Sequence, residues 1–184
     1  MGRLLTILFC SVLTATALDA QDPVFSQFFA APMQVNPAFA GTTFAPRITV
    51  NYRNQWADYE GGYETYSVAY EQSLEDLNSG FGIVVLGDDA GNGIYNTTRF
   101  HGVYSYRIKI NRTSAVRIGV EAGMIQSSLD WDQLIFLDQL DPITGASGGG
   151  GVPTPTEEQR PVNLNNTAVD IGAGLLFNSE NAYA

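Results

Sequence analysis

The sequence predicts an all-β protein, and specifically an antiparallel β-barrel of the kind that spans a membrane. Three observations predict this class. About six segments alternate apolar and polar side chains with a period of two, as half-buried strands do. Turns rich in Gly, Asp and Asn separate these segments. The segments follow an apolar leader of the kind carried by exported proteins.

The leader is "MGRLLTILFCSVLTATALDA". It has one cation, Arg3, followed by an uncharged run over residues 4–18 that is too short and wrongly flanked for a transmembrane helix. We therefore interpret residues 1–20 as a secretory signal peptide. Cleavage after Ala20 is favoured, and cleavage after Ala17 is the alternative.

A segment without strand alternation follows, at residues 21–46. Its sequence "DPVFSQFFAAPMQVNPAFAG" is rich in aromatic side chains and is interrupted by Pro32 and Pro37. We expect this segment to pack as a plug over the mouth of the barrel and to bury its aromatic rings without sheet pairing. The rings are those of Phe25, Phe28, Phe29 and Phe39. The alternative is an extension that only fixes the first strand.

Strands are expected over residues 47–56, 63–74, 80–89, 97–110, 114–131 and 167–177. The clearest is 97–110, "TTRFHGVYSYRIKI", where aromatic and aliphatic residues oppose Arg99, His101 and Lys109. The run 80–89, "GFGIVVLGDD", is apolar on both faces. A flexible Gly/Pro-rich loop is expected over residues 141–166, and no helix is expected after the leader.

The period of the strands leaves two architectures open. A membrane barrel places its apolar face towards lipid, whereas a soluble sandwich or lipocalin-like barrel places it inwards. Two features favour the membrane. Aromatic residues gather near strand ends, as in interfacial girdles, and the apolar faces include small residues that a packed core uses less freely. The aromatic residues are Tyr63, Tyr66, Tyr95, Tyr104, Tyr106 and Phe177; the small ones are Gly102, Ala122 and Ala173.

The number of strands is small for a closed membrane barrel. About eight strands are the minimum if no hydrogen-bonding edge is to face lipid. We therefore interpret residues 47–184 as the N-terminal part of a longer barrel. The alternative is an intact small protein whose sheet is completed by a partner.

Composition and motifs argue against several classes of function. Nine Lys and Arg against 19 Asp and Glu give a net charge of -10, which disfavours a nucleic-acid partner. His101 is the only histidine, Cys10 lies in the leader, and no Gly-x-Ser-x-Gly is present, so no metal site, cofactor site or catalytic set is expected. The turn "GDDAGNG" lacks the ligand spacing of an EF-hand calcium loop, and we interpret it as a solvated turn. His101 is expected to line the lumen.

The candidate partner-binding residues fall in two places. In "SLDWDQLIF", Trp131 between Asp130 and Asp132 suggests an aromatic contact with a partner, because tryptophan is enriched at interface hot spots. The alternative is a strand-end aromatic in a girdle. Phe25 and Phe28 of the N-terminal segment are the other candidates.

Several blocks of the chain resemble the PorP/SprF family of the type IX secretion system of Bacteroidetes-type bacteria. They occur in the family's order over Gln21 to about Ser179 and include "QDPVFSQFFAAPMQVNPAFAGT", "RITVNYRNQW", "TYSVAYEQSL", "GFGIVVLGDDAGNG", "YSYRIKI", "GVEAGMIQSSLDWDQLIFLDQLDP" and "DIGAGLLFNS". None of these blocks is a catalytic motif. Members of the family are longer than this chain.

The resemblance implies an outer-membrane β-barrel that helps to secrete or anchor cell-surface proteins, in some members gliding adhesins. The implied partners are the C-terminal sorting domains of type IX substrates, other type IX components and outer-membrane lipid. The rival interpretation is a porin-like channel whose lumen is lined by Arg99, Arg107, Lys109, Arg117 and Glu121. A soluble periplasmic binding barrel is the third.

Overall fold

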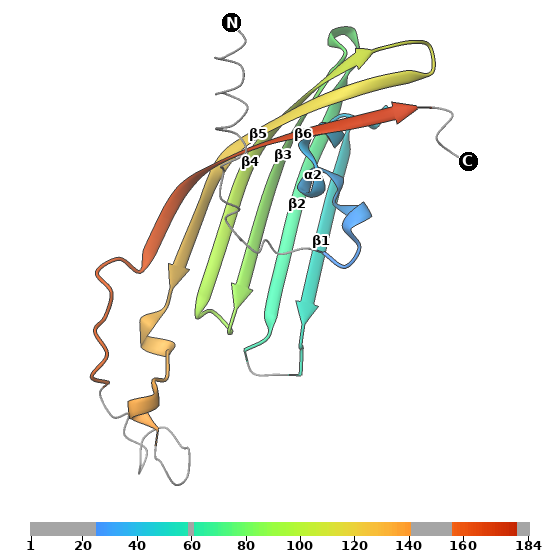
Figure 1. Cartoon of the computed structure of the whole chain (residues 1–184). Helices are drawn as coiled ribbons and strands as arrows, with labels where there is room; N and C mark the ends of the chain where they lie inside the picture. Colours follow the sequence, from blue (N-terminus) through green and yellow to red (C-terminus); the bar gives the residue numbers. More distant parts are fainter. Residues whose placement is uncertain (1–24, 59–60, 141–155, 180–184) are drawn as a thin grey trace, which may run out of the picture.

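The computed structural model describes residues 25–58, 61–140 and 156–179, which form one curved antiparallel sheet (Figure 1). The predicted signal peptide and most of the predicted 141–166 loop lie outside these residues. The six strands pair in chain order. They are β1 (Arg47–Gln55), β2 (Tyr63–Leu74), β3 (Ser79–Ala90), β4 (Tyr95–Lys109), β5 (Ser114–Leu129) and β6 (Asn165–Ser179). The all-β, antiparallel fold is thus confirmed.

The two ends of the sheet differ in their connections. At the end drawn uppermost in Figure 1, β2 joins β3 through residues 75–78 and β4 joins β5 through residues 110–113; we call this the short-turn end. The opposite end carries the connections 56–62 and 91–94 and the connection 130–164 between β5 and β6; we call this the long-loop end. Residues 75–78 form a tight turn that ends at Asn78, whose backbone is left-handed, a conformation that asparagine tolerates.

The two faces of the sheet differ as the alternation predicts. One face, which we call the apolar face, carries large apolar side chains that are exposed in this structure. Examples from five strands are Val50, Val68, Val85, Phe100, Val120 and Met124. The side chains of the opposite face, which we call the polar face, include buried Thr65, Ser67, Glu71, His101 and Ser105.

Residues 25–41, which we call the N-terminal segment, lie across the polar face (Figure 1). They form the short turns η1 (Phe28–Ala30) and η2 (Pro37–Phe39), with α2 (Pro32–Val35) between them. The expectation of no helix after the leader is therefore wrong. Pro32 supplies a backbone angle suited to the first helical position. A four-residue helix is too short to leave a helical period in the sequence.

The packed core lies between the N-terminal segment and the polar face. Met33 and Ala40 pack with Ala69, Val84 and Val103. A second cluster joins Phe25, Ala31 and Leu86. These contacts explain why β3 is apolar on both faces: Val84 and Leu86 point to the covered side, whereas Val85 points to the exposed one.

β1 and β6 are the edges of the sheet formed by the described residues, and each pairs with one strand. Closure into a barrel stays a prediction. Among residues 25–58, 61–140 and 156–179, no helix has the length and apolar character needed to cross a bilayer.

Candidate functional site

A row of small residues crosses the polar face perpendicular to the strands. Gly80 of β3 lies opposite Ser105 of β4, Ser105 opposite Gly119 of β5, and Gly119 opposite Gly174 of β6. The row leaves a shallow track because three of its four members have no side chain. Residues 36–41 of the N-terminal segment lie in this track. A Cβ added at Gly119 would overlap the backbone of Pro37 and Ala38.

Hydrogen bonds fix the N-terminal segment in the track. The Ser105 hydroxyl donates to the carbonyl of Ala40 at 2.6 Å, and Nη1 of Arg117 donates to the same carbonyl at 3.1 Å. Nδ2 of Asn36 donates to the carbonyl of Leu175 in β6 at 3.1 Å. The segment is thus held by three strands: by side chains of β4 and β5 and by the backbone of β6.

Glu71 of β2 provides the most deeply buried charged contact of the segment. Its residue exposure is 1%. Oε2 accepts the backbone N–H of Gly41 at 2.9 Å, and Oε1 accepts Nε of Arg47 at 2.7 Å and forms an ion pair with that guanidinium. Both carboxylate oxygens therefore have partners, as a buried charge requires.

The burial of the aromatic rings differs from the prediction. Phe25 is buried and Phe39 is half-buried, but Phe28 is 58% exposed and Phe29 is 72% exposed, with their rings edge to face at 5.9 Å. The expectation that all four rings are buried is wrong for Phe28 and Phe29. The track is shallow and lined by glycine, so small residues such as Ala38 and Ala40 are the ones buried there. Sequence reasoning missed these two alanines.

His101 lies on the polar face, as expected of a lumen-lining residue. Its side chain passes over Gly123 of β5 and reaches Asp170 of β6, which follow it in cross-strand register. Nε2 lies 3.2 Å from Oδ2 of Asp170. The two groups are close enough for an ion pair when the imidazole is protonated, although they are not aligned as a hydrogen bond.

The predicted residues Asp130, Trp131 and Asp132 lie at the long-loop end, directly after β5. The Trp131 ring packs on Phe136, with ring centroids 4.7 Å apart and an interplanar angle of 40°. Asp132 is exposed and forms an ion pair with Arg160. Asp130 has a local role, because its Oδ1 accepts the Asp132 N–H and caps η4 (Trp131–Gln133). These residues and the N-terminal segment occupy separate parts of the molecule.

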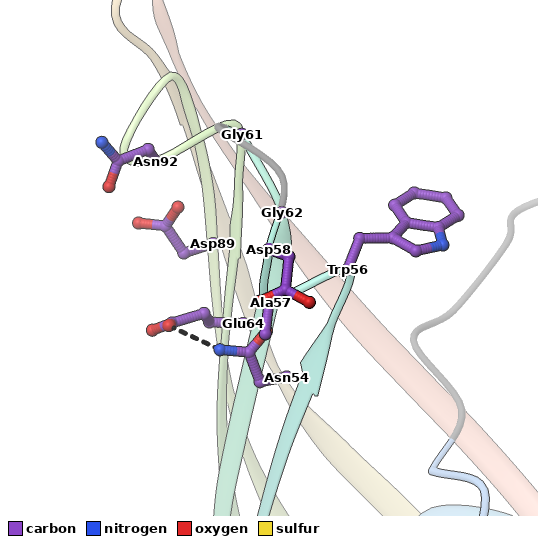
Figure 2. A pocket seen from close by; sticks show the side chains of 9 residues that line it. All are labelled: Asn54, Trp56, Ala57, Asp58, Gly61, Gly62, Glu64, Asp89 and Asn92. Carbon is purple, nitrogen blue, oxygen red and sulfur yellow. Dashed lines mark hydrogen bonds between the residues drawn. The ribbon is translucent and has the colours of Figure 1, made fainter.

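A polar pocket also lies at the long-loop end, between the β1–β2 and β3–β4 connections (Figure 2). Asn54 donates to Glu64 at 3.1 Å, and Asp89 accepts the N–H of Gly93 at 2.8 Å. Figure 2 shows the Trp56 ring on the opposite side of the ribbon from Asp89 and Glu64. In the described part of the chain, no group of three His, Cys, Asp or Glu residues could hold a metal ion.

The architecture is that of a β-sheet membrane protein. One face of the sheet carries a band of apolar side chains that the other described residues leave uncovered, while the chain's own N-terminal segment covers part of the polar face. The family model described as "Type IX secretion system membrane protein PorP/SprF" matches residues 17–184. The chain belongs to this family, which confirms the resemblance seen in the sequence. Neither the curated proteins nor the solved structures gave a match.

Proposed function

We propose that this chain is an outer-membrane component of the type IX secretion system that binds proteins passing through the system and helps to secrete them or anchor them at the cell surface. It acts by binding and not by catalysis. The proposed partners are the C-terminal sorting domains of secreted substrates, gliding adhesins among them, together with other type IX components and outer-membrane lipid. The observation that carries this proposal is the two-faced sheet in a chain of this family.

The apolar face has the dimensions of a membrane band. On β5 its apolar side chains extend from Val116 to Met124, which are eight residues apart on the same face. Eight steps of a strand span ~27 Å. A strand tilt of about 40° reduces this to a height of roughly 21 Å, comparable to the apolar band of an outer-membrane barrel.

Aromatic residues that are wholly or partly exposed in two regions favour protein binding. Trp131 is half-buried against Phe136 at the long-loop end, and the Phe28 and Phe29 rings project from the segment that covers the polar face. Aromatic anchors of this kind dominate the energetics of many interfaces. We propose that Trp131 with Asp130 and Asp132 forms one contact with a partner, and that Phe25 and Phe28 belong to a second, in which buried Phe25 positions exposed Phe28.

The test of this function is made in cells. Trp131→Ala should weaken a buried partner contact by about 2 kcal/mol or more, roughly thirtyfold in affinity, and should release surface proteins into the medium while the variant stays in the outer-membrane fraction. Trp56→Ala is the matched control, because it removes the same side chain at the same end but near the β1 edge. Normal retention of every type IX substrate in cells lacking the gene would contradict the proposal.

The porin-like alternative has one observation in its favour, the charged residues Arg99, Arg107, Arg117 and Glu121 on the polar face. If the N-terminal segment acts as a plug, the purified full-length protein should conduct little in a planar bilayer. Deletion of residues 21–41 should then raise the conductance. Large steady currents from the intact protein would favour the channel.

A further inference from the structure

A cleft of about 600 Å³ opens on the polar face at the short-turn end. It lies between residues 41–44, which follow the N-terminal segment, and the β4–β5 hairpin. Four cations line it: Arg107, Lys109, Arg112 and Arg117. The described lining includes one carboxylate, Glu75. The chain as a whole is acidic, with nine Lys and Arg against 19 Asp and Glu. The cleft is therefore a basic site on an acidic protein.

The cross-strand register places two of these cations against each other. Arg107 of β4 lies directly opposite Arg117 of β5, and Lys109 is the next residue of β4 on the same face. Like charges directly opposite in a sheet are destabilising. In the part of the chain that the structure describes, none of the four cations forms an ion pair with a carboxylate.

Contacts within the protein use only some of the hydrogen-bond donors. Nη1 of Arg117 donates to Ala40 and, at 3.4 Å, to Ser105. Nη2 of Arg107 donates to Oδ1 of Asn78 at 3.4 Å, and its buried Nε has no acceptor among the described residues. A guanidinium fork binds carboxylates in a planar, two-point geometry. The cleft therefore presents oriented donors whose positive charge is offset only in part, because Glu71 lies near Arg117 but is ion-paired with Arg47.

We propose that this cleft binds an acidic segment of a partner protein. A lipid headgroup is disfavoured because the cleft opens on the polar face, whereas acyl chains contact the apolar face. Phe44 lines the cleft and is 96% exposed, which provides an apolar contact beside the cations. The inference rests on the proposed function in one respect, that the chain holds another protein.

The experiment measures binding of a fluorescein-labelled hexaglutamate peptide to the full-length protein in non-ionic detergent, by fluorescence anisotropy. Arg107→Gln/Lys109→Gln should weaken binding about tenfold or more, and added salt should weaken binding to the unsubstituted protein. Arg117 is left in place because it holds Ala40. The matched control is Arg53→Gln/Arg160→Gln, which removes the same net charge at the long-loop end and should bind as the unsubstituted protein does.

Thermal unfolding separates loss of the site from loss of the fold. Because the double substitution removes like-charge repulsion, it should leave the melting temperature unchanged or higher. Equal binding by the double variant, or equal binding of a hexalysine peptide, would overturn the proposal. So would binding only to phosphatidylglycerol vesicles, which would identify a headgroup site. The peptide measurement uses purified protein, so its failure is distinct from failure of the secretion function in cells.

Discussion

Glu71 and Gly41 are joined by a buried hydrogen bond, in which the N–H of Gly41 donates to Oε2 at 2.9 Å. The second carboxylate oxygen binds Arg47 at the start of β1. One side chain of β2 therefore fixes both the end of the N-terminal segment and the entry into the first strand. The position of the segment on the sheet depends on this carboxylate.

Glu71→Ala should loosen the N-terminal segment. The substitution leaves the Gly41 N–H and the Arg47 guanidinium without their acceptor, and an unsatisfied buried group costs roughly 1–3 kcal/mol. We expect a lower urea midpoint and faster proteolysis within residues 25–41. Glu64→Ala is the control, because that carboxylate is exposed and accepts from Asn54 away from the segment. Unchanged protease protection in Glu71→Ala would contradict this role.

Gly119→Ala should displace the N-terminal segment from its track. The added methyl group would overlap the backbone of Pro37 and Ala38, which cannot move aside as a flexible side chain does. Amide hydrogen exchange of residues 36–41 should accelerate. Gly102→Ala, on the apolar face of β4, would place its methyl group 3.9 Å from the carbonyl oxygen of Ala122 and should change exchange little. Equal exchange in the two variants would show that the segment does not depend on close approach to the sheet.

Val85→Arg should hinder membrane insertion. Val85 lies on the apolar face, where the cross-strand register places it between Val68 of β2 and Phe100 of β4. An arginine near the midplane of a membrane barrel costs about 2–4 kcal/mol. The expected result is a smaller folded fraction in lipid vesicles, measured by urea titration. Val162→Arg, at a residue that is 99% exposed in the β5–β6 connection, should insert normally. Equal folding of both variants would contradict the membrane assignment of this face.

Acid should open a contact in the β5–β6 connection. The backbone N–H of Glu157 donates to Asp138 at 2.7 Å and holds the pKa of that carboxyl below its ordinary value, with a further contribution from the Thr156 hydroxyl. Because the folded pKa is lowered, the contact is fully stabilising above the ordinary pKa of 3.8 and is lost as the pH falls through the lowered value.

The measurement is the exchange rate of the Glu157 amide as a function of pH, corrected for intrinsic exchange. Asp138→Asn should give fast exchange at neutral pH as well. Asp76→Asn, an exposed acid at the short-turn end, is the control and should leave the Glu157 amide protected. Protection that is independent of pH in the unsubstituted protein would refute the contribution of Asp138.

The strands could be predicted closely because alternation is a local property of the sequence. Residues 63–74 were predicted and found for β2. β6 extends over Asn165–Ser179, beyond the predicted 167–177, because its ends consist of Asn and Ser, which are typical of turns. Local patterns therefore located the strands and missed several of their ends by one or two residues in either direction; β5, for example, ends at Leu129 and not at residue 131.

The track beneath the N-terminal segment could not be predicted in the same way. Gly80, Gly119 and Gly174 come from three strands, and only the cross-strand register brings them into one row. In the sequence, each glycine indicates only a position at which the strand is locally less stable. Hydrophobicity alone predicts that Phe28 and Phe29 are buried. The structure instead buries Ala38 and Ala40, because the shallow track has room only for small side chains.

The hydrogen bond between Asn36 and Leu175 spans 139 positions of the chain. The N-terminal segment is synthesised before any strand, yet its track is complete only after β6 has paired with β5, because Gly174 and Leu175 belong to β6. Contacts this distant in sequence form late, since loop closure must precede them. The docking of residues 36–41 therefore depends on the pairing of β6, and it distinguishes a sheet that has acquired β6 from a shorter intermediate.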